Sequence, residues 1–224
     1  NHTYNLDSPL QKTVPYYYYR EWEDGTISNG SDCGNETASE RPMMRKFMIE
    51  SVLYWAKEYH IDGFRFDLMG VHDLDTMKAV RKALDQVNPD IMVYGEGWTG
   101  GESALPAAQQ ATKNNIYRLD RVGAFSDDIR DGIKGSVFDF LDKGFVSGKD
   151  DMEEKIKFSV VAATPHSQVT LTKAGDKCTN WSGQPGQSIN YISCHDNLTF
   201  WDKLAISNAD DSEADRVKMN KLGS

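Results

Sequence analysis

Apolar residues recur along the chain at a spacing typical of helices. Met44, Met48, Val52, Trp55 and Tyr59 lie three or four positions apart, which predicts a helix over residues 43–59 with these side chains in the core. The same pattern predicts a second helix over 73–87, which Asn-Pro-Asp ends. Further helical segments are predicted at 127–134, 151–163 and 211–222.

Short apolar runs rich in β-formers predict the strands between these helices. They cover residues 61–68, 91–94 and 188–194, with a shorter run at 121–126. Because helices and strands alternate with short connections, the pattern predicts βα units and a parallel sheet.

Polar residues follow these strands at their C-terminal ends. Asp67 ends the first strand, Glu96 follows the second between two glycines, and His195-Asp196 follows the run at 188–194. In parallel α/β folds, active sites form at the C-terminal ends of the strands. Carboxylates in this register favour a common functional site over independent surface acids.

Arg65 and Asp67 form the most informative pair. They are two positions apart in a predicted strand, so their side chains share one face. The pair alone fits two interpretations about equally: an ion pair at a strand end, or an active-site carboxylate that a guanidinium keeps ionised. Glu96 and Asp196 at later strand ends favour the second interpretation.

Two parts of the chain are less regular. Residues 1–42 contain many turn formers together with Tyr16–Tyr19 and Trp22. These aromatic side chains either cover a core edge, which we slightly favour, or form a platform for flat apolar ligand faces such as sugar rings. Residues 138–187 are the least regular and are interpreted as an insertion.

The composition narrows the partners of the chain. Its 224 residues are 39% hydrophobic and 26% charged, as in ordinary globular proteins, and no apolar run approaches a membrane span. The net charge of −9 argues against nucleic acid and fits a neutral or cationic ligand. The spacing of Cys33, Cys178 and Cys194 predicts neither a disulfide framework nor a zinc site, and leaves a single disulfide open.

Three stretches, DGFRFDLMG, YGEGW and YISCHDN, resemble in this order signature motifs of α-amylase-type glycoside hydrolases. The initial Asn1-His2 resembles the end of a further motif. FDLMG, SDCGNETASERPM and FSDDIRDGIKGSVFD make the resemblance closest to type I pullulanases, debranching enzymes that cut α-1,6 bonds in pullulan and limit dextrins. The resemblance spans essentially the whole chain.

The resemblance implies an α/β fold, a (β/α)8 TIM barrel with the site at its C-terminal face. Residues 1–224 would form part of that catalytic barrel, roughly strands 4–7. Residues 1–42 would be the long loop after strand 3, and 138–187 an irregular insertion before strand 7. The remaining strands would lie outside the chain, so we expect the chain alone to be inactive or poorly folded.

The same resemblance implies roles for individual residues in a retaining, double-displacement hydrolysis of α-1,6-glucosidic branch linkages. Asp67 would be the nucleophile, Glu96 the general acid/base, and Asp196 the third carboxylate that holds sugar hydroxyls. Arg65 would keep Asp67 ionised and oriented. Substrate contacts are implied for His2, His195, Trp98, Leu68, Met69 and Asn197.

Alternatives within this superfamily are an isoamylase-like enzyme, an amylase or a transglycosylase. A non-catalytic glucan-binding protein is a further alternative. It is disfavoured for the parent protein because all three carboxylates are present, and it stays open for the chain alone as a glucan-binding fragment. No cofactor is required, although some relatives bind Ca²⁺ near the position of Asn1. The expected partner is an α-glucan; the oligomeric state and the compartment (secreted, cell-surface or cytoplasmic in a bacterium) are left open.

Overall fold

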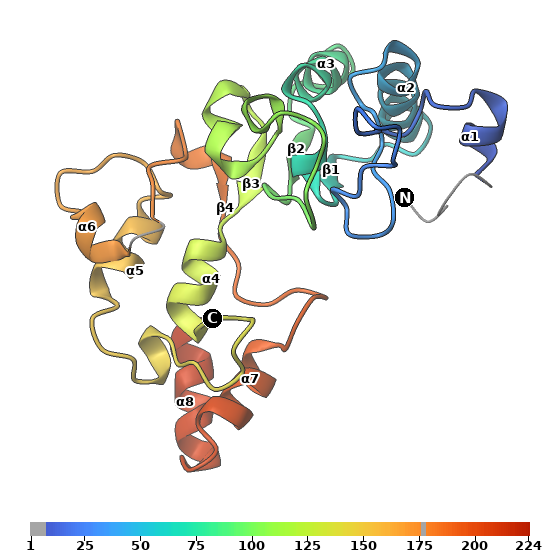
Figure 1. Cartoon of the computed structure of the whole chain (residues 1–224). Coiled ribbons are helices and arrows are strands. Elements are labelled where there is room, and N and C mark those ends of the chain that lie inside the picture. Colours follow the sequence, from blue (N-terminus) through green and yellow to red (C-terminus); the bar gives the residue numbers. More distant parts are fainter. Residues whose placement is uncertain (1–7, 176–177) are drawn as a thin grey trace. The chain divides into compact units, whose positions relative to one another are not determined.

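The computed structural model describes residues 8–175 and 178–224 (Figure 1). The chain divides into two compact units, Asn1–Ala124 and Phe125–Ser224. Each unit has its own buried side chains and is described by itself.

The first unit is built on parallel strands. β1 (Gly63–Phe66) pairs with β2 (Met92–Gly95), and β2 pairs with β3 (Gly123–Phe125). In the first pair Phe66 lies opposite Gly95, so both strands end at the same level. The predicted parallel α/β arrangement is confirmed; β1 and β3 are shorter than predicted, whereas β2 has the predicted length and is displaced by one residue.

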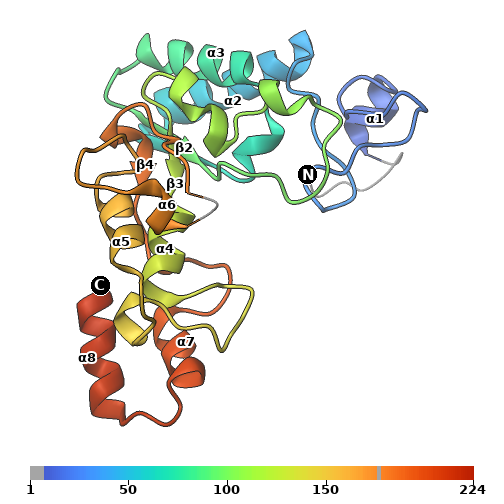
Figure 2. The ribbon, with the colours of Figure 1, turned by 60° about the vertical axis from the view of Figure 1, so that its left-hand side comes forward.

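Helices connect these strands. α2 (Pro42–Glu58) precedes β1, and α3 (Leu74–Asp85) lies between β1 and β2; Figures 1 and 2 show the two helices side by side. Asp73 caps α3 because its carboxylate accepts the N–H of Thr76 at 2.9 Å. α1 (Pro9–Thr13) and the 3-10 helices η1 (Met69–Val71), η2 (Ala107–Gln109) and η3 (Lys113–Arg118) complete this unit.

The core of the first unit corrects one prediction about α2. Met44, Met48 and Val52 are buried as predicted, but Trp55 and Tyr59 are 45% and 57% exposed. The buried residues of α2 follow a strict four-residue row that continues to Ala56, and this row packs against the rest of the unit. Trp55 and Tyr59 instead pack on each other, with ring centroids 4.7 Å apart.

The second unit is mainly helical. It contains α4 (Asp127–Lys134), α5 (Glu153–Val160), α6 (Leu171–Ala174), α7 (Phe200–Ser207) and α8 (Glu213–Gly223). The 3-10 helices η4 (Phe145–Ser147) and η5 (Pro185–Gln187) lie between them. Figure 2 shows α7 and α8 side by side.

The strand predicted over 188–194 is wrong in length. Only β4 (Ser188–Ile189) is a strand, beside the end of β3, where the N–H of Ser126 donates to the carbonyl of Ile189 at 2.9 Å. The following residues form no ladder. The Ser193 hydroxyl instead accepts the N–H of Phe200 at 2.8 Å, at the start of α7.

Among the described residues, no helix has the length and apolar character needed to cross a membrane.

Candidate active site

The ends of β1 and β2 bring three predicted site residues of the first unit together. Arg65 belongs to β1, Asp67 follows it, and Glu96 comes directly after β2. Because the parallel strands end in register, side chains from both ends meet at one edge of the sheet.

Arg65 bridges the two carboxylates. Its Nη1 forms an ion pair with Oδ1 of Asp67, which is the predicted contact across one strand face. Its Nη2 lies 3.0 Å from Oε1 of Glu96, a contact that links β1 to β2. A planar guanidinium suits this role because its donors are fixed in a fork.

The two carboxylates differ sharply in exposure. The Asp67 side chain is 74% exposed, whereas that of Glu96 is 8% exposed. The second oxygen of Glu96, Oε2, accepts the N–H of Leu68 at 2.6 Å. Each oxygen of Glu96 therefore has a partner, Arg65 or the Leu68 amide, while most of the Asp67 carboxylate is open to solvent.

A tight turn after β1 aims the Leu68 amide at Glu96. Leu68 adopts a left-handed conformation with φ 41°, which is strained for a non-glycine residue. Gly70 then donates its N–H to the carbonyls of Glu96 at 3.1 Å and Trp98 at 3.2 Å. A side chain on Gly70 would collide with the Trp98 carbonyl, so glycine permits the close approach.

The residues predicted to contact substrate in this unit have different surroundings. Leu68 and Trp98 are half-buried, so part of each side chain is open to a ligand. Met69, which is predicted to line a subsite, begins η1 and is 0% exposed.

A groove of about 410 Å³ opens beside Asp67. Arg65, Asp67, Leu68 and His72 line one side of it, and apolar residues of α2 line the other. Sequence reasoning missed His72, although it lies two positions beyond the FDLMG motif. Burial, with a smaller effect from the charge of Arg20, lowers the pKa of His72 to about 4, so its imidazole is neutral at pH 7.

The remaining predicted residues belong elsewhere. His195, Asp196 and Asn197 lie in the second unit, where His195 Nε2 is 3.6 Å from Asp196 Oδ2 and their side chains are 70% and 54% exposed. Asn197 adopts φ 62°, a conformation that asparagine tolerates better than most residues. His2 lies outside the described residues.

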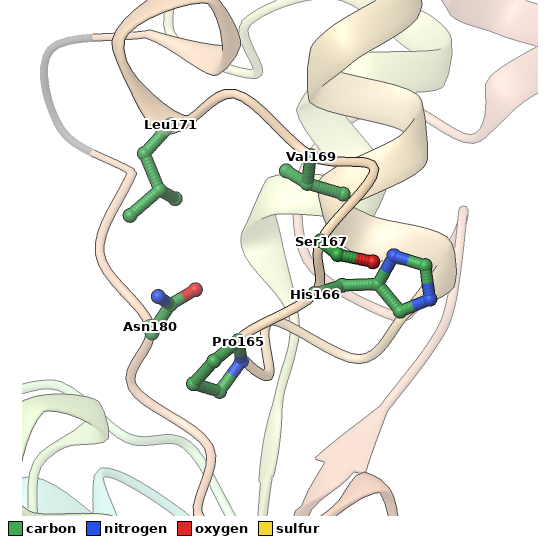
Figure 3. Close-up of a pocket in the computed structure, with 6 residues that line it drawn as sticks. All are labelled: Pro165, His166, Ser167, Val169, Leu171 and Asn180. Carbon is green, nitrogen blue, oxygen red and sulfur yellow. The ribbon is translucent and has the colours of Figure 1, made fainter.

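The second unit has a separate cavity of about 310 Å³. Figure 3 shows Pro165, Leu171 and Asn180 around this space, with the His166 ring beside Ser167 and turned away from Leu171. No predicted site residue lines it.

Two further findings concern metals and thiols. Among the described residues, no group of three or more His, Cys, Asp or Glu side chains is arranged to hold a metal ion. In the same part of the chain, Cys33 and Cys194 are exposed and form no disulfide.

Parallel βα units with carboxylates at the strand ends fit part of a (β/α) barrel of the enzyme type. No protein-family model matches the sequence. The chain is 36% identical to the pullulanase of Bacillus subtilis (strain 168) over 223 residues, which is 99% of the chain and 30% of that protein. It is 31% identical to the chloroplastic pullulanase 1 of Arabidopsis thaliana over 263 residues, 99% of the chain and 27% of that protein.

Solved structures agree with these relatives. The pullulanase of Paenibacillus barengoltzii, in complex with maltohexaose and α-cyclodextrin, matches with a TM-score of 0.89 and 44% identity, over 100% of this chain and 33% of that one. The type I pullulanase of Bacillus subtilis complexed with maltose matches with a TM-score of 0.90 and 36% identity, over 100% and 30%. The chain belongs to the pullulanase family, and it spans a third or less of the length of the relatives it matches.

Proposed function

We propose that this chain supplies the nucleophile and the general acid/base of a debranching glycoside hydrolase that cleaves α-1,6-glucosidic linkages in pullulan, starch or glycogen. The carrying observation is the Arg65 bridge between exposed Asp67 and buried Glu96 at neighbouring strand ends. The pullulanase relatives, several of them in complex with maltooligosaccharides, support the choice of an α-glucan.

In this proposal Asp67 is the nucleophile. Its carboxylate is exposed, and Arg65 holds one of its oxygens, which orients the other toward the anomeric carbon. Attack forms a covalent glycosyl-enzyme intermediate, and water then hydrolyses it with overall retention of configuration.

Glu96 protonates the leaving glycosidic oxygen and then deprotonates the incoming water. In the structure one of its oxygens accepts the N–H of Leu68 and the other lies 3.0 Å from Nη2 of Arg65, and these two contacts hold the carboxyl group at the end of β2.

The other residues complete the proposed machinery. Asp196 would hold sugar hydroxyls, and His195, Asn197 and His2 would hydrogen-bond the sugar at the cleavage point. Trp98 and Leu68 would line the flanking subsites. This part of the proposal rests on the motifs, since Asp196 belongs to the second unit and His2 lies outside the described residues.

The test is product analysis with the complete polypeptide that carries this chain. Incubation with pullulan should yield maltotriose, the product of α-1,6 cleavage, and Asp67→Asn and Glu96→Gln should each lose hydrolysis while still unfolding in a cooperative thermal transition. Asp75→Asn is the matched control, because its carboxylate is also exposed, at 77%, but lies on α3.

Cleavage of α-1,4 bonds instead would support an amylase-type relative. Near-normal turnover by Asp67→Asn or Glu96→Gln would overturn the assignment of these carboxylates.

A further inference from the structure

A second hollow lies on the first unit, apart from the groove beside Asp67. It has a volume of about 390 Å³ and is formed by residues 16–22, 38–41 and 104–109. It shares no lining residue with the groove beside Asp67. Its volume falls in the range of small-molecule sites, ~300–1,000 Å³.

Two aromatic side chains stand open at this hollow. Tyr16 is 63% exposed and Trp22 is 37% exposed, whereas Tyr19 beside them is 5% exposed and belongs to the core. Tyr16 also holds φ 63°, a costly conformation for a bulky residue. Tyr19 therefore belongs to the core, whereas Tyr16 and Trp22 leave flat apolar faces open at the hollow.

The charges of the side chains that line the hollow sum to zero. They are two guanidinium groups, Arg20 and Arg41, and two carboxylates, Glu21 and Glu40. A site with this balance attracts neither an anion nor a cation through net charge. Its hydrogen-bonding groups and aromatic faces instead suit a neutral ligand with many hydroxyls.

Buried contacts of Arg20 fix the position of Glu40, one of the carboxylates that line the hollow. Arg20 is 6% exposed, and its Nη2 lies 2.7 Å from Oε2 of Glu40. Its Nη1 lies 3.0 Å from Oε1 of Glu36 and donates to the Val71 carbonyl at 3.1 Å. The Glu40 carboxylate, 35% exposed, is thus fixed before any ligand arrives, which lowers the ordering cost of binding.

We propose that this hollow is a second binding site for a neutral oligosaccharide, an α-glucan segment that stacks on Tyr16 and Trp22 and bonds to Glu21 and Glu40. A sugar ring has an apolar C–H face and a hydroxyl rim, and both find their counterpart here. The choice of an α-glucan among sugars rests on the proposed function. Such a site would hold a branched polymer while another segment is cleaved.

The test measures binding and catalysis separately in the complete polypeptide. Affinity electrophoresis in gels containing amylopectin, with the Asp67→Asn background, reports binding without turnover. Trp22→Ala and Tyr16→Ala should each weaken glucan affinity about 10-fold, because each removes one of the two proposed stacking faces. In the background with Asp67 intact, both should leave kcat/KM on a short branched oligosaccharide unchanged.

Tyr117→Ala is the matched control, since Tyr117 is an equally open aromatic of the same unit, 61% exposed, outside the hollow. Glu21→Gln keeps the side-chain size, guards against misfolding and should weaken binding about threefold. Glucan affinity of the Trp22 and Tyr16 variants equal to that of Tyr117→Ala would overturn the proposal.

Failure of the proposed function has a different signature. In that case the wild-type protein would not release maltotriose from pullulan, whereas the second site is tested by binding alone. Retardation lost in Trp22→Ala with no hydrolysis by the wild type would support the site and contradict the enzyme assignment.

Discussion

Removal of the Arg65 guanidinium should destabilise the protein mainly through Glu96. The side chain of Glu96 is 8% exposed and Arg65 lies 3.0 Å away, so Arg65→Met leaves a buried carboxylate with only the Leu68 amide as a partner. Loss of a hydrogen-bonded partner by a buried charged group costs about 1–3 kcal/mol. Asp67 is 74% exposed, and its pair with Arg65 should contribute only about 0–1 kcal/mol.

Double-mutant cycles separate the two contributions. We expect Arg65→Met with Glu96→Gln to show a coupling free energy of about 1–3 kcal/mol, and Arg65→Met with Asp67→Asn to show about 0–1 kcal/mol. The assay is urea denaturation of the four proteins in each cycle, compared at the midpoint of the same transition. Lys78→Met with Asp75→Asn is the control cycle, because that pair is 3.5 Å apart with side chains 48% and 77% exposed.

A larger coupling to Asp67 than to Glu96 would refute the reasoning. It would mean that the exposed contact, and not the buried one, holds the ends of β1 and β2 together.

Three further predictions follow from the same contacts. Gly70→Ala should destabilise the protein by about 1–3 kcal/mol, because a methyl group would meet the Trp98 carbonyl, and should lower kcat more than it changes KM; an unchanged melting temperature would contradict this. The pKa of His72, lowered to about 4, lies below its unfolded value, so the unfolded state binds the proton first and stability should fall as the pH drops from 6.5 toward 4. The urea midpoint should depend less on pH between 6.5 and 4 in His72→Gln than in the wild type. Parallel pH curves for the two proteins would contradict this prediction. The 224-residue chain alone should not hydrolyse pullulan, and a cooperative melt together with maltotriose release by this chain would disprove that expectation.

The parallel strands and their helices were predictable because both depend on local periodicity. The apolar stripe of α3 contains Met77, Val80 and Leu84, all fully buried, so the four-residue and three-residue steps there matched the packing. Trp55 and Tyr59 show the limit of the same signal. Periodicity finds a face of α2, but which part of that face is covered depends on how the helix crosses its neighbours.

At the strand ends, local sequence determines one contact of Arg65 and does not determine the other. The alternation of side chains placed Arg65 and Asp67 together, and the structure has that ion pair. The contact between Arg65 and Glu96 depends on the register of β1 and β2, which no local pattern contains. The left-handed conformation of Leu68 is also not predictable from a run of apolar residues.

The second unit was harder to predict because its elements are short. The apolar run at 188–194 has strand composition, yet only Ser188–Ile189 is a strand. α7, with 8 residues, was missed because few turns of a helix produce little periodicity, as was the 5-residue α1 of the first unit.

The central claim, that Asp67 is the nucleophile and Glu96 the acid/base, is tested most directly by trapping the covalent intermediate. The complete polypeptide with Glu96→Gln would be incubated with a maltooligosaccharyl fluoride, whose good leaving group needs no acid, and peptides would be analysed by mass spectrometry. The account predicts a glycosyl ester on the peptide that contains Asp67, with slow turnover because the base is missing. An ester on another carboxylate, or hydrolysis with inverted configuration and no ester, would contradict it.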